Sequence, residues 1–205
     1  MRYSRFQLLS LVVVILFVGA CNHGSPGTDA SQKVTGAFGK LKTTYPYRVS
    51  ETIDYLSSAS QNHAVRSLEV ATADHMHLKV TGIGTGEWVT TGGEIYDFSG
   101  GHWRRIVTEK TDWSDVGRLI ASNMTSATDD GVDTVNGIPC LRYALTFQGQ
   151  SSGMGYKGEG KAWIAIADGL PQQLDADLMM STTSTNKMHA IYDYPISVDI
   201  PKPKL

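Results

Sequence analysis

The chain has 205 residues, a formal net charge of -2 and 41% hydrophobic residues. This length fits one domain with a sizeable core. No run of basic residues occurs, which argues against nucleic-acid binding and against docking on a membrane through a polybasic segment.

The N-terminus has the pattern of a secretory signal peptide. Arg2 and Arg5 precede an apolar run over residues 8–17, which is shorter than the roughly 20 apolar residues that a membrane-spanning helix needs. A basic start, a short apolar stretch and small residues are typical of an export signal. The sequence Val18-Gly19-Ala20-Cys21 resembles the bacterial lipobox, whose cysteine is acylated and becomes the mature N-terminus. The alternative is a plain signal peptide with a chance cysteine.

These observations predict three segments. Residues 1–20 form the signal peptide, residues 21–31 a lipidated flexible tether rich in small polar residues, and residues 32–205 a single domain. If Cys21 carries lipid, Cys140 has no disulfide partner and is expected to pack as a small apolar residue. The anchor would hold the protein on the extracytoplasmic face of a membrane in the cell envelope, in the periplasm or its equivalent. The sequence leaves open whether that membrane is the inner or the outer one.

The domain begins with a helical pattern and continues with strands. Apolar residues at spacings of three and four predict a helix over residues 29–43. Alternation then predicts a strand over 47–55, on which Glu51 shares the otherwise apolar face. Further strands are expected over 64–71, 76–80, 140–147, 156–167, 172–180 and 187–194, with short hairpins at Gly92-Gly93 and Gly100-Gly101.

Two segments interrupt the strands. Helical spacing of apolar residues predicts a second helix over 112–123, and residues 128–139 read as turns around a short strand. Strands and helices do not alternate, so a parallel doubly wound sheet is excluded. The predicted fold class is α+β, mainly β, with about 9–11 antiparallel strands and two or so helices.

Motifs that suggest catalysis are weak. Gly149 to Gly153 match G-x-S-x-G around Ser151, but a hydrolase needs that motif at a strand-to-helix turn, and here it joins two strands. His75 and His77 share a strand face with Lys79 and lack the further ligands of a zinc site. We therefore expect no enzyme, no cofactor and no metal.

The apolar face of residues 140–147, "CLRYALTF", covers either a packed core or a cavity, and its periodicity does not distinguish the two. A large sheet covered by two helices would leave part of its concave face unfilled, and mobile Met side chains would suit acyl chains there. The candidate cavity residues are Tyr47, Val49, Ile53, Leu78, Trp103, Leu119, Leu141, Tyr143, Leu145, Phe147 and Trp163.

A lipobox, a helix and a long antiparallel meander together resemble the lipoprotein-localisation-factor superfamily, which includes LolA, LolB and the mycobacterial lipoproteins LppX and LprG. The local matches are "GEIYDFSGGHWRRI", "VNGIPCLRYALTF", "KAWIAIADGLPQQLDADL" and "YDYPISVDIPKP". The resemblance implies a strongly curved, unclosed β-barrel whose concave face is covered by helices and holds acyl chains. It also implies that the helix at 112–123 acts as a lid. No arginine here matches by sequence the one that holds the lid in the soluble carrier.

Two functions follow as hypotheses. The first is a membrane-anchored bacterial lipoprotein that binds lipid or lipoprotein acyl chains in an apolar cavity, for transfer across or within the cell envelope. The second is a non-enzymatic structural, interaction or sensor lipoprotein with a filled β core and an envelope protein as partner. A hydrolase that uses Ser151 is a third and weaker reading. The first two differ in whether the concave face is hollow.

Overall fold

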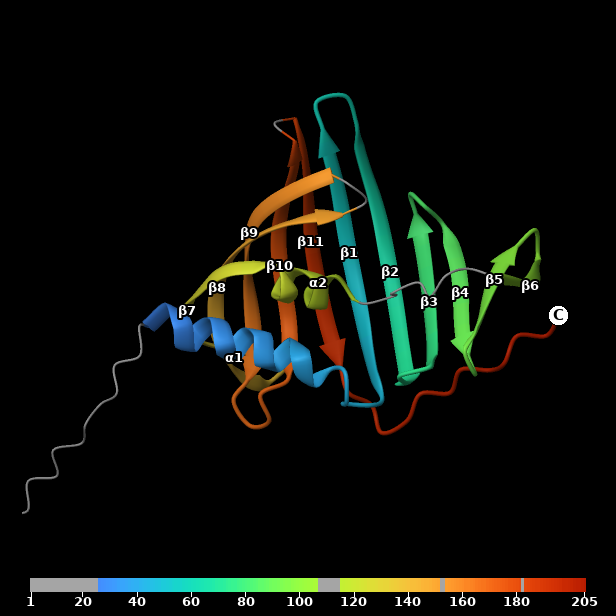
Figure 1. Ribbon diagram of the computed structural model, residues 1–205, viewed down its shortest axis with the longest axis horizontal. Helices are drawn as coiled ribbons and strands as arrows, with labels where there is room; N and C mark the ends of the chain where they lie inside the picture. The colour runs from blue at the N-terminus through green and yellow to red at the C-terminus, as the bar shows by residue number, and fades with distance from the viewer. Residues whose placement is uncertain (1–25, 107–114, 152–153, 182) are drawn as a thin grey trace, which may run out of the picture.

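A computed structural model describes residues 26–106, 115–151, 154–181 and 183–205 (Figure 1). The predicted signal peptide and residues 21–25 of the tether, with Cys21, lie outside these residues, whereas residues 26–31 of the tether are part of a helix. The described residues form two helices and eleven strands: α1 (Pro26–Lys40), β1 (Tyr47–Ser57), β2 (Gln61–Thr72), β3 (His75–Gly82), β4 (Gly86–Thr91), β5 (Glu94–Ser99), β6 (His102–Ile106), α2 (Val116–Ser122), β7 (Met124–Val135), β8 (Ile138–Ser151), β9 (Met154–Ala165), β10 (Pro171–Ser181) and β11 (Ser184–Asp193). The mainly β prediction is confirmed.

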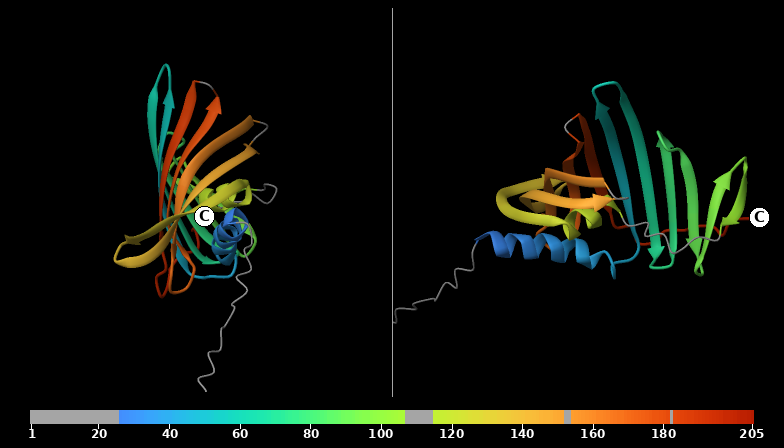
Figure 2. Two further views of the ribbon diagram at one scale, coloured as in Figure 1. Left: turned by 90° about the vertical axis from the view of Figure 1, so that its left-hand side faces the viewer. Right: turned by 45° about the horizontal axis from the view of Figure 1, so that its top comes forward.

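All eleven strands belong to one antiparallel sheet in the order β6-β5-β4-β3-β2-β1-β11-β10-β9-β8-β7. The chain therefore runs as a meander from β1 outward to β6, restarts at the opposite edge with β7, and returns until β11 pairs with β1. Since β6 and β7 do not pair, the sheet stays open. Figure 2 shows that it is strongly curved and that both helices lie on its concave side. The unclosed, curved architecture that the family resemblance implied is confirmed.

Helix α1 packs its predicted apolar stripe onto the concave face. Val34, Phe38 and Leu41 are at most 2% exposed and belong to the main core cluster. The Ser31 hydroxyl accepts a hydrogen bond from the Ala127 backbone N–H at 3.0 Å, which ties the helix to β7. The helix ends at Lys40 rather than Thr43, because hydrogen bonds from residues 41–44 back to residues 38–40 form a turn.

Strand β7 differs from the prediction of turns around a short strand. It is a continuous strand of 12 residues whose register shifts between Asp129 and Val132. Arg142 of β8 holds this bulge, since its guanidinium donates to the Asp130 carboxylate at 2.8 Å, the Asp130 carbonyl at 2.8 Å and the Asp133 carboxylate at 2.9 Å. Asp130 and Asp133, which lie in the segment expected to form turns, are thus partners of one arginine.

Candidate functional site

The concave face is a continuous apolar surface that crosses the junction between the two meanders. Tyr192 of β11 pairs with Val49 of β1, Val49 with Leu68 of β2, and Leu68 with Leu78 of β3. Side chains in register across neighbouring strands point to the same face of a sheet. All four residues are buried in the core cluster that also contains the apolar stripe of α1. The face therefore extends from under α1 toward the β6 side of the sheet.

The structure brings together eight of the eleven candidate cavity residues on this face: Tyr47, Val49, Ile53, Leu78, Leu141, Tyr143, Leu145 and Phe147. Leu141 is half-buried, and the other seven are buried. The stretch "CLRYALTF" therefore points its apolar side chains at the concave face. In this state Tyr143, Leu145 and Phe147 are at most 3% exposed.

The three other candidates lie elsewhere. Trp163 is paired with Arg142 and joins Val135 and Cys140 in a small cluster on the convex face, where its indole donates to Asp133 at 3.1 Å. Trp103 also lies on the convex face, with its ring centroid 5.2 Å from that of Phe98. Leu119 of α2 is half-buried and lines a pocket of about 310 Å³ between the two helices. Strand alternation explains why both tryptophans lie on the convex face, because the side chains of their neighbours in the strand point to the concave face.

A buried polar cluster fastens α2 to the middle of the sheet. Glu51 is 1% exposed, and its Oε1 accepts a hydrogen bond from the Val116 backbone N–H at 3.0 Å. Its Oε2 lies 2.6 Å from Nη1 of Arg66, which β2 presents beside it. Asp115 is fully buried and caps α2 by accepting from the Arg118 backbone N–H at 2.9 Å, while the Tyr192 hydroxyl donates to the same Oδ1 at 2.9 Å.

Burial shifts the protonation equilibria in this cluster. Removal from water raises the pKa of both Glu51 and Asp115, because a carboxylate is costly to desolvate; at Glu51 the Arg66 charge opposes the shift. The pKa of Tyr192 is raised well above its ordinary value by burial and by the nearby Asp115 charge. One oxygen of Asp115, Oδ2, has no hydrogen-bond partner among the described residues. The attachment of α2 therefore includes a carboxylate that is incompletely compensated.

Gly117 fixes how closely α2 approaches the sheet. A Cβ at this position would lie 2.1 Å from the Tyr192 hydroxyl and 2.6 Å from Cε1 of Phe38, and real Cβ contacts are not this short. Only glycine permits this approach, which places α2 between α1 and β11. The family resemblance implied a lid at residues 112–123; the structure has the shorter helix Val116–Ser122 there, and residues 112–114 lie outside the described part of the chain.

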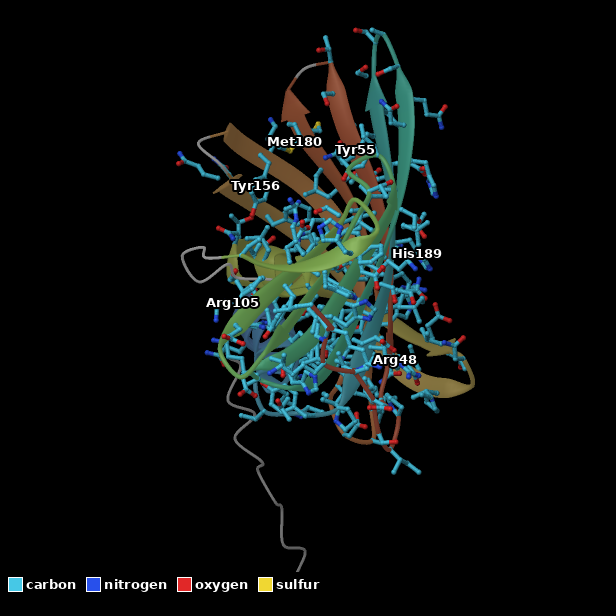
Figure 3. All side chains as sticks on the ribbon, turned by 90° about the vertical axis from the view of Figure 1, so that its right-hand side faces the viewer. Arg48, Tyr55, Arg105, Tyr156, Met180 and His189 are labelled. Carbon is cyan, nitrogen blue, oxygen red and sulfur yellow. The ribbon has the colours of Figure 1, made fainter. Side chains whose placement is uncertain are left out.

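A separate pocket of about 710 Å³ opens where β8 and β10 end and β9 begins. The residues that line it are Thr125, Gln148, Gly149, Gln150, Gly155, Tyr156, Lys157, Met179 and Met180. Figure 3 shows Tyr156, Met180 and Tyr55 near the same end of the sheet. The volume falls within the range of roughly 300–1,000 Å³ that is typical of small-molecule sites.

The serine and histidine motifs that suggested catalysis or metal binding lie in ordinary positions of the sheet. Ser151 is the last residue of β8 in an antiparallel hairpin with β9, so the strand-to-helix turn of a hydrolase is missing at this position. His77 lies on the convex face between Glu69 at 3.4 Å and Glu87 at 2.8 Å. Within the described residues, no three His, Cys, Asp or Glu side chains come close enough to hold a metal ion.

The residues that attach α2 were not among the site residues that the sequence predicts. Glu51 was visible as a charge on an apolar strand face, which is a usable signal for a buried ion pair. Its partner Val116 is 65 residues away in the chain, and Asp115 meets a tyrosine 77 residues away. Arg66 is an arginine beside α2 that no local motif identified.

Comparison with known proteins defines the fold. No family model matches the sequence, and no curated protein matches it. Among solved structures, LprF from Mycobacterium bovis has a TM-score of 0.55 at 14% identity, covering 88% of this chain and 99% of LprF. The Mycobacterium tuberculosis lipoprotein LppX has a TM-score of 0.46 at 11% identity over 84% of this chain and 99% of LppX.

The LolA superfamily protein NE2245 from Nitrosomonas europaea has a TM-score of 0.37 at 8% identity over 84% of this chain and 95% of that protein. Of these three structures, LprF has a TM-score above 0.5, and its likeness to this chain concerns the fold. In the part of the chain that the structure describes, no helix is long and apolar enough to cross a membrane. The chain has a fold like that of LprF.

Proposed function

We propose that the protein is a membrane-anchored bacterial lipoprotein that binds lipid or lipoprotein acyl chains against the concave face of its sheet. The supporting observation is the apolar surface from Tyr192 through Val49 and Leu68 to Leu78, which lies on the helix side of an open sheet. Transfer of each acyl methylene from water to such a surface contributes about 0.8 kcal/mol. The function is non-enzymatic, and Cys21 carries the anchor.

In this proposal α2 is the lid over the bound chains. It is only 7 residues long, and polar contacts of Glu51, Asp115 and Tyr192 hold it to the sheet. Polar contacts contribute a modest net free energy, about 0.5–1.5 kcal/mol each. Helix α2 also buries Ile120 and Ala121 in the core, but it has 7 residues against the 15 of α1, so we expect α2 to be released more readily than α1.

The second candidate is an interaction or sensor lipoprotein with a filled core. It is favoured by the burial of Tyr143, Leu145 and Phe147, which pack within the main core cluster. The two candidates predict different behaviour toward a free acyl chain. A lipid carrier rearranges its helices and takes up the chain, whereas a filled core does not.

The test is uptake of 1-pyrenedodecanoic acid, a fluorescent fatty acid, by residues 22–205. This form contains every described helix and strand. A cooperative thermal transition is the control that shows it is folded before uptake is measured. Saturable binding with a stoichiometry near one and a blue-shifted, protected fluorophore supports the proposal. Fluorescence that rises no more than with heat-unfolded protein contradicts it and favours the filled core.

A further inference from the structure

Arg118 on α2 is a half-buried cation without a carboxylate partner. Five other arginines in the described part of the chain each form an ion pair at 2.6–3.7 Å: Arg48, Arg66, Arg104, Arg105 and Arg142. No described residue forms such a pair with Arg118. A charge that is partly removed from water is costly unless an opposite charge compensates it. The structure therefore leaves Arg118 with a place for an anion from outside the chain.

Two groups of the chain lie near Arg118 without neutralising it. Burial raises the pKa of Tyr47, and the Arg118 guanidinium opposes that rise, which places the guanidinium beside the Tyr47 hydroxyl. Burial also raises the pKa of Asp115, and the charge of Arg118 is one of the influences that oppose it. The Asp115 carboxylate itself accepts from the Arg118 backbone N–H and from Tyr192. Since a guanidinium has five N–H donors, contact with one hydroxyl leaves donors for a bidentate partner.

Arg118 lines the pocket of about 310 Å³ between α1 and α2. The two helices contact each other on the concave side of the sheet (Figure 2). Thr35, Gly39 and Lys42 line the pocket from one flank of α1 and the turn after it, since they are spaced by four and three residues. Ser122 follows Arg118 by one helical turn and lines the opposite side. The side chains of both helices therefore face the same groove.

This groove combines a cationic rim with an apolar floor. Lys42 and Arg118 line it, and its described lining residues include no carboxylate. Lys42 is exposed and, like Arg118, forms no ion pair within the described part of the chain. Phe38 and Ala121 also line the groove and belong to the buried core cluster. At Gly39 the groove is open, because a Cβ there would meet no atom within 4 Å.

We propose that the groove between α1 and α2 binds the anionic headgroup of an acyl lipid, a carboxylate or a phosphate. Arg118 is its bidentate ligand, and Lys42 supplies the second positive charge. The first methylenes of the chain contact Phe38 and then pass between the helices toward the concave face. The site rests on the proposed function, because the remainder of the chain is taken to lie on that face.

The experiment compares two probes that share a chain and a fluorophore: 1-pyrenedodecanoic acid and its methyl ester, which carries no charge. Affinities are measured for residues 22–205 and for the variants Arg118→Gln, Arg118→Lys and Gly39→Leu. Arg118→Lys keeps the charge but loses the bidentate geometry. Gly39→Leu fills the groove and leaves both cations in place.

Each change has a matched control. Arg48→Gln removes one positive charge from the convex face, where Arg48 pairs with Glu69. Gly36→Leu adds the same side chain to α1 at the other glycine where a Cβ would meet no atom within 4 Å. Gly36 is not among the residues that line the groove. Competition with dodecyl phosphate and with sodium phosphate distinguishes a lipid headgroup from a free anion.

Because charge-assisted bidentate hydrogen bonds are the stronger class, Arg118→Gln should weaken binding of the acid about tenfold and of the ester less than about twofold. Arg118→Lys should lose part of this affinity, about threefold. Gly39→Leu should weaken the acid about fivefold by occupying the site of the headgroup. Both controls should bind the acid like the unaltered protein. Dodecyl phosphate should compete, and sodium phosphate at the same concentration should not.

Three results would overturn the headgroup site while leaving acyl binding intact. The first is equal affinity of Arg118→Gln and the unaltered protein for the acid. The second is equal affinity of Gly39→Leu and Gly36→Leu, which would place the anion outside the groove. The third is equal competition by sodium phosphate, which would make the site one for a free anion. Failure of both probes to bind the unaltered protein would instead overturn the proposed function, and this site with it.

Discussion

Glu51 of β1 accepts a hydrogen bond from the backbone N–H of Val116, the first residue of α2, at 3.0 Å. The sheet and the short helix are thus joined by a carboxylate that Arg66 neutralises from the next strand. A polar contact at the centre of an apolar face is costly unless it is fully paired. Its placement under the proposed lid makes it the first target for mutation.

Replacing Glu51 by Ala should destabilise the fold, because Arg66 would keep a largely buried charge without a partner. Breaking a buried ion pair from one side costs about 3–5 kcal/mol. Chemical denaturation measures this loss. The double replacement Glu51→Leu/Arg66→Met should recover most of it, since an apolar pair removes both desolvation penalties. A double variant as unstable as Glu51→Ala would contradict the claim that the loss comes from the unpaired charge of Arg66.

Asp115 predicts a defined dependence of stability on pH. Burial raises the pKa of Asp115 in the folded state above the ordinary value of 3.8, which applies to the unfolded state. Between the unfolded-state and the folded-state pKa, the folded protein therefore binds more protons than the unfolded chain. Stability from this group therefore falls as pH rises through that window and does not return above it. Asp115→Asn keeps an oxygen that can accept from Arg118 and Tyr192 but cannot ionise.

The difference in melting temperature, Asp115→Asn minus the unaltered protein, should accordingly increase between pH 4 and pH 8. The comparison cancels the exposed acids, whose lowered pKa values act in the opposite direction. A difference that stays constant over this range would show that Asp115 ionises equally in both states.

Gly117→Ala should detach α2 or strain it. The new Cβ would meet the Tyr192 hydroxyl, which is held by Asp115 and is not free to move aside. Overpacking of this kind costs about 1–3 kcal/mol. The matched control is Gly36→Ala on the exposed side of α1, where no atom lies within 4 Å and the better helix propensity should stabilise by up to about 1 kcal/mol. Equal effects of the two changes on denaturant midpoints would contradict the close packing of α2.

Leu145→Trp should block the space that acyl chains would occupy. Leu145 is 3% exposed on the concave face, and Thr146 beside it is exposed on the convex face. Uptake of 1-pyrenedodecanoic acid should fall at least fivefold in Leu145→Trp and remain unchanged in Thr146→Trp. Leu145→Ala, which enlarges the space, should bind at least as well as the unaltered protein. Equal uptake by both tryptophan variants would place the chain elsewhere.

Local pattern was sufficient to predict most of the fold. The stripe of Val34, Phe38 and Leu41 is helical by spacing alone, and the alternation in 140–147 fixes which side chains share a face. Trp163 shows the limit of choosing residues by type. Ala162 and Ile164, on either side of Trp163 in β9, belong to the core cluster, so alternation along that strand sends the large aromatic side chain to the convex face.

The attachment of α2 and the pocket at the strand ends could not be predicted. The residues that attach α2 are far apart in sequence and meet only because β11 returns to pair with β1. The pocket lies among neighbouring strands and depends on the shape of their ends, which periodicity does not give. Glycines at 117 and 149 matter through close contacts with Tyr192 and Tyr156, and a single sequence does not reveal such neighbours. Whether the concave face is filled or hollow also depends on side-chain volumes across the whole sheet rather than on any local pattern.

Native mass spectrometry of residues 22–205, purified gently from bacteria, tests the central claim most directly. The account predicts a co-purifying mass that extracts into organic solvent as an acyl lipid and is reduced in Leu145→Trp. A clean mass of the bare chain, together with no uptake of added 1-pyrenedodecanoic acid, would contradict it. "CLRYALTF" would then face a filled core.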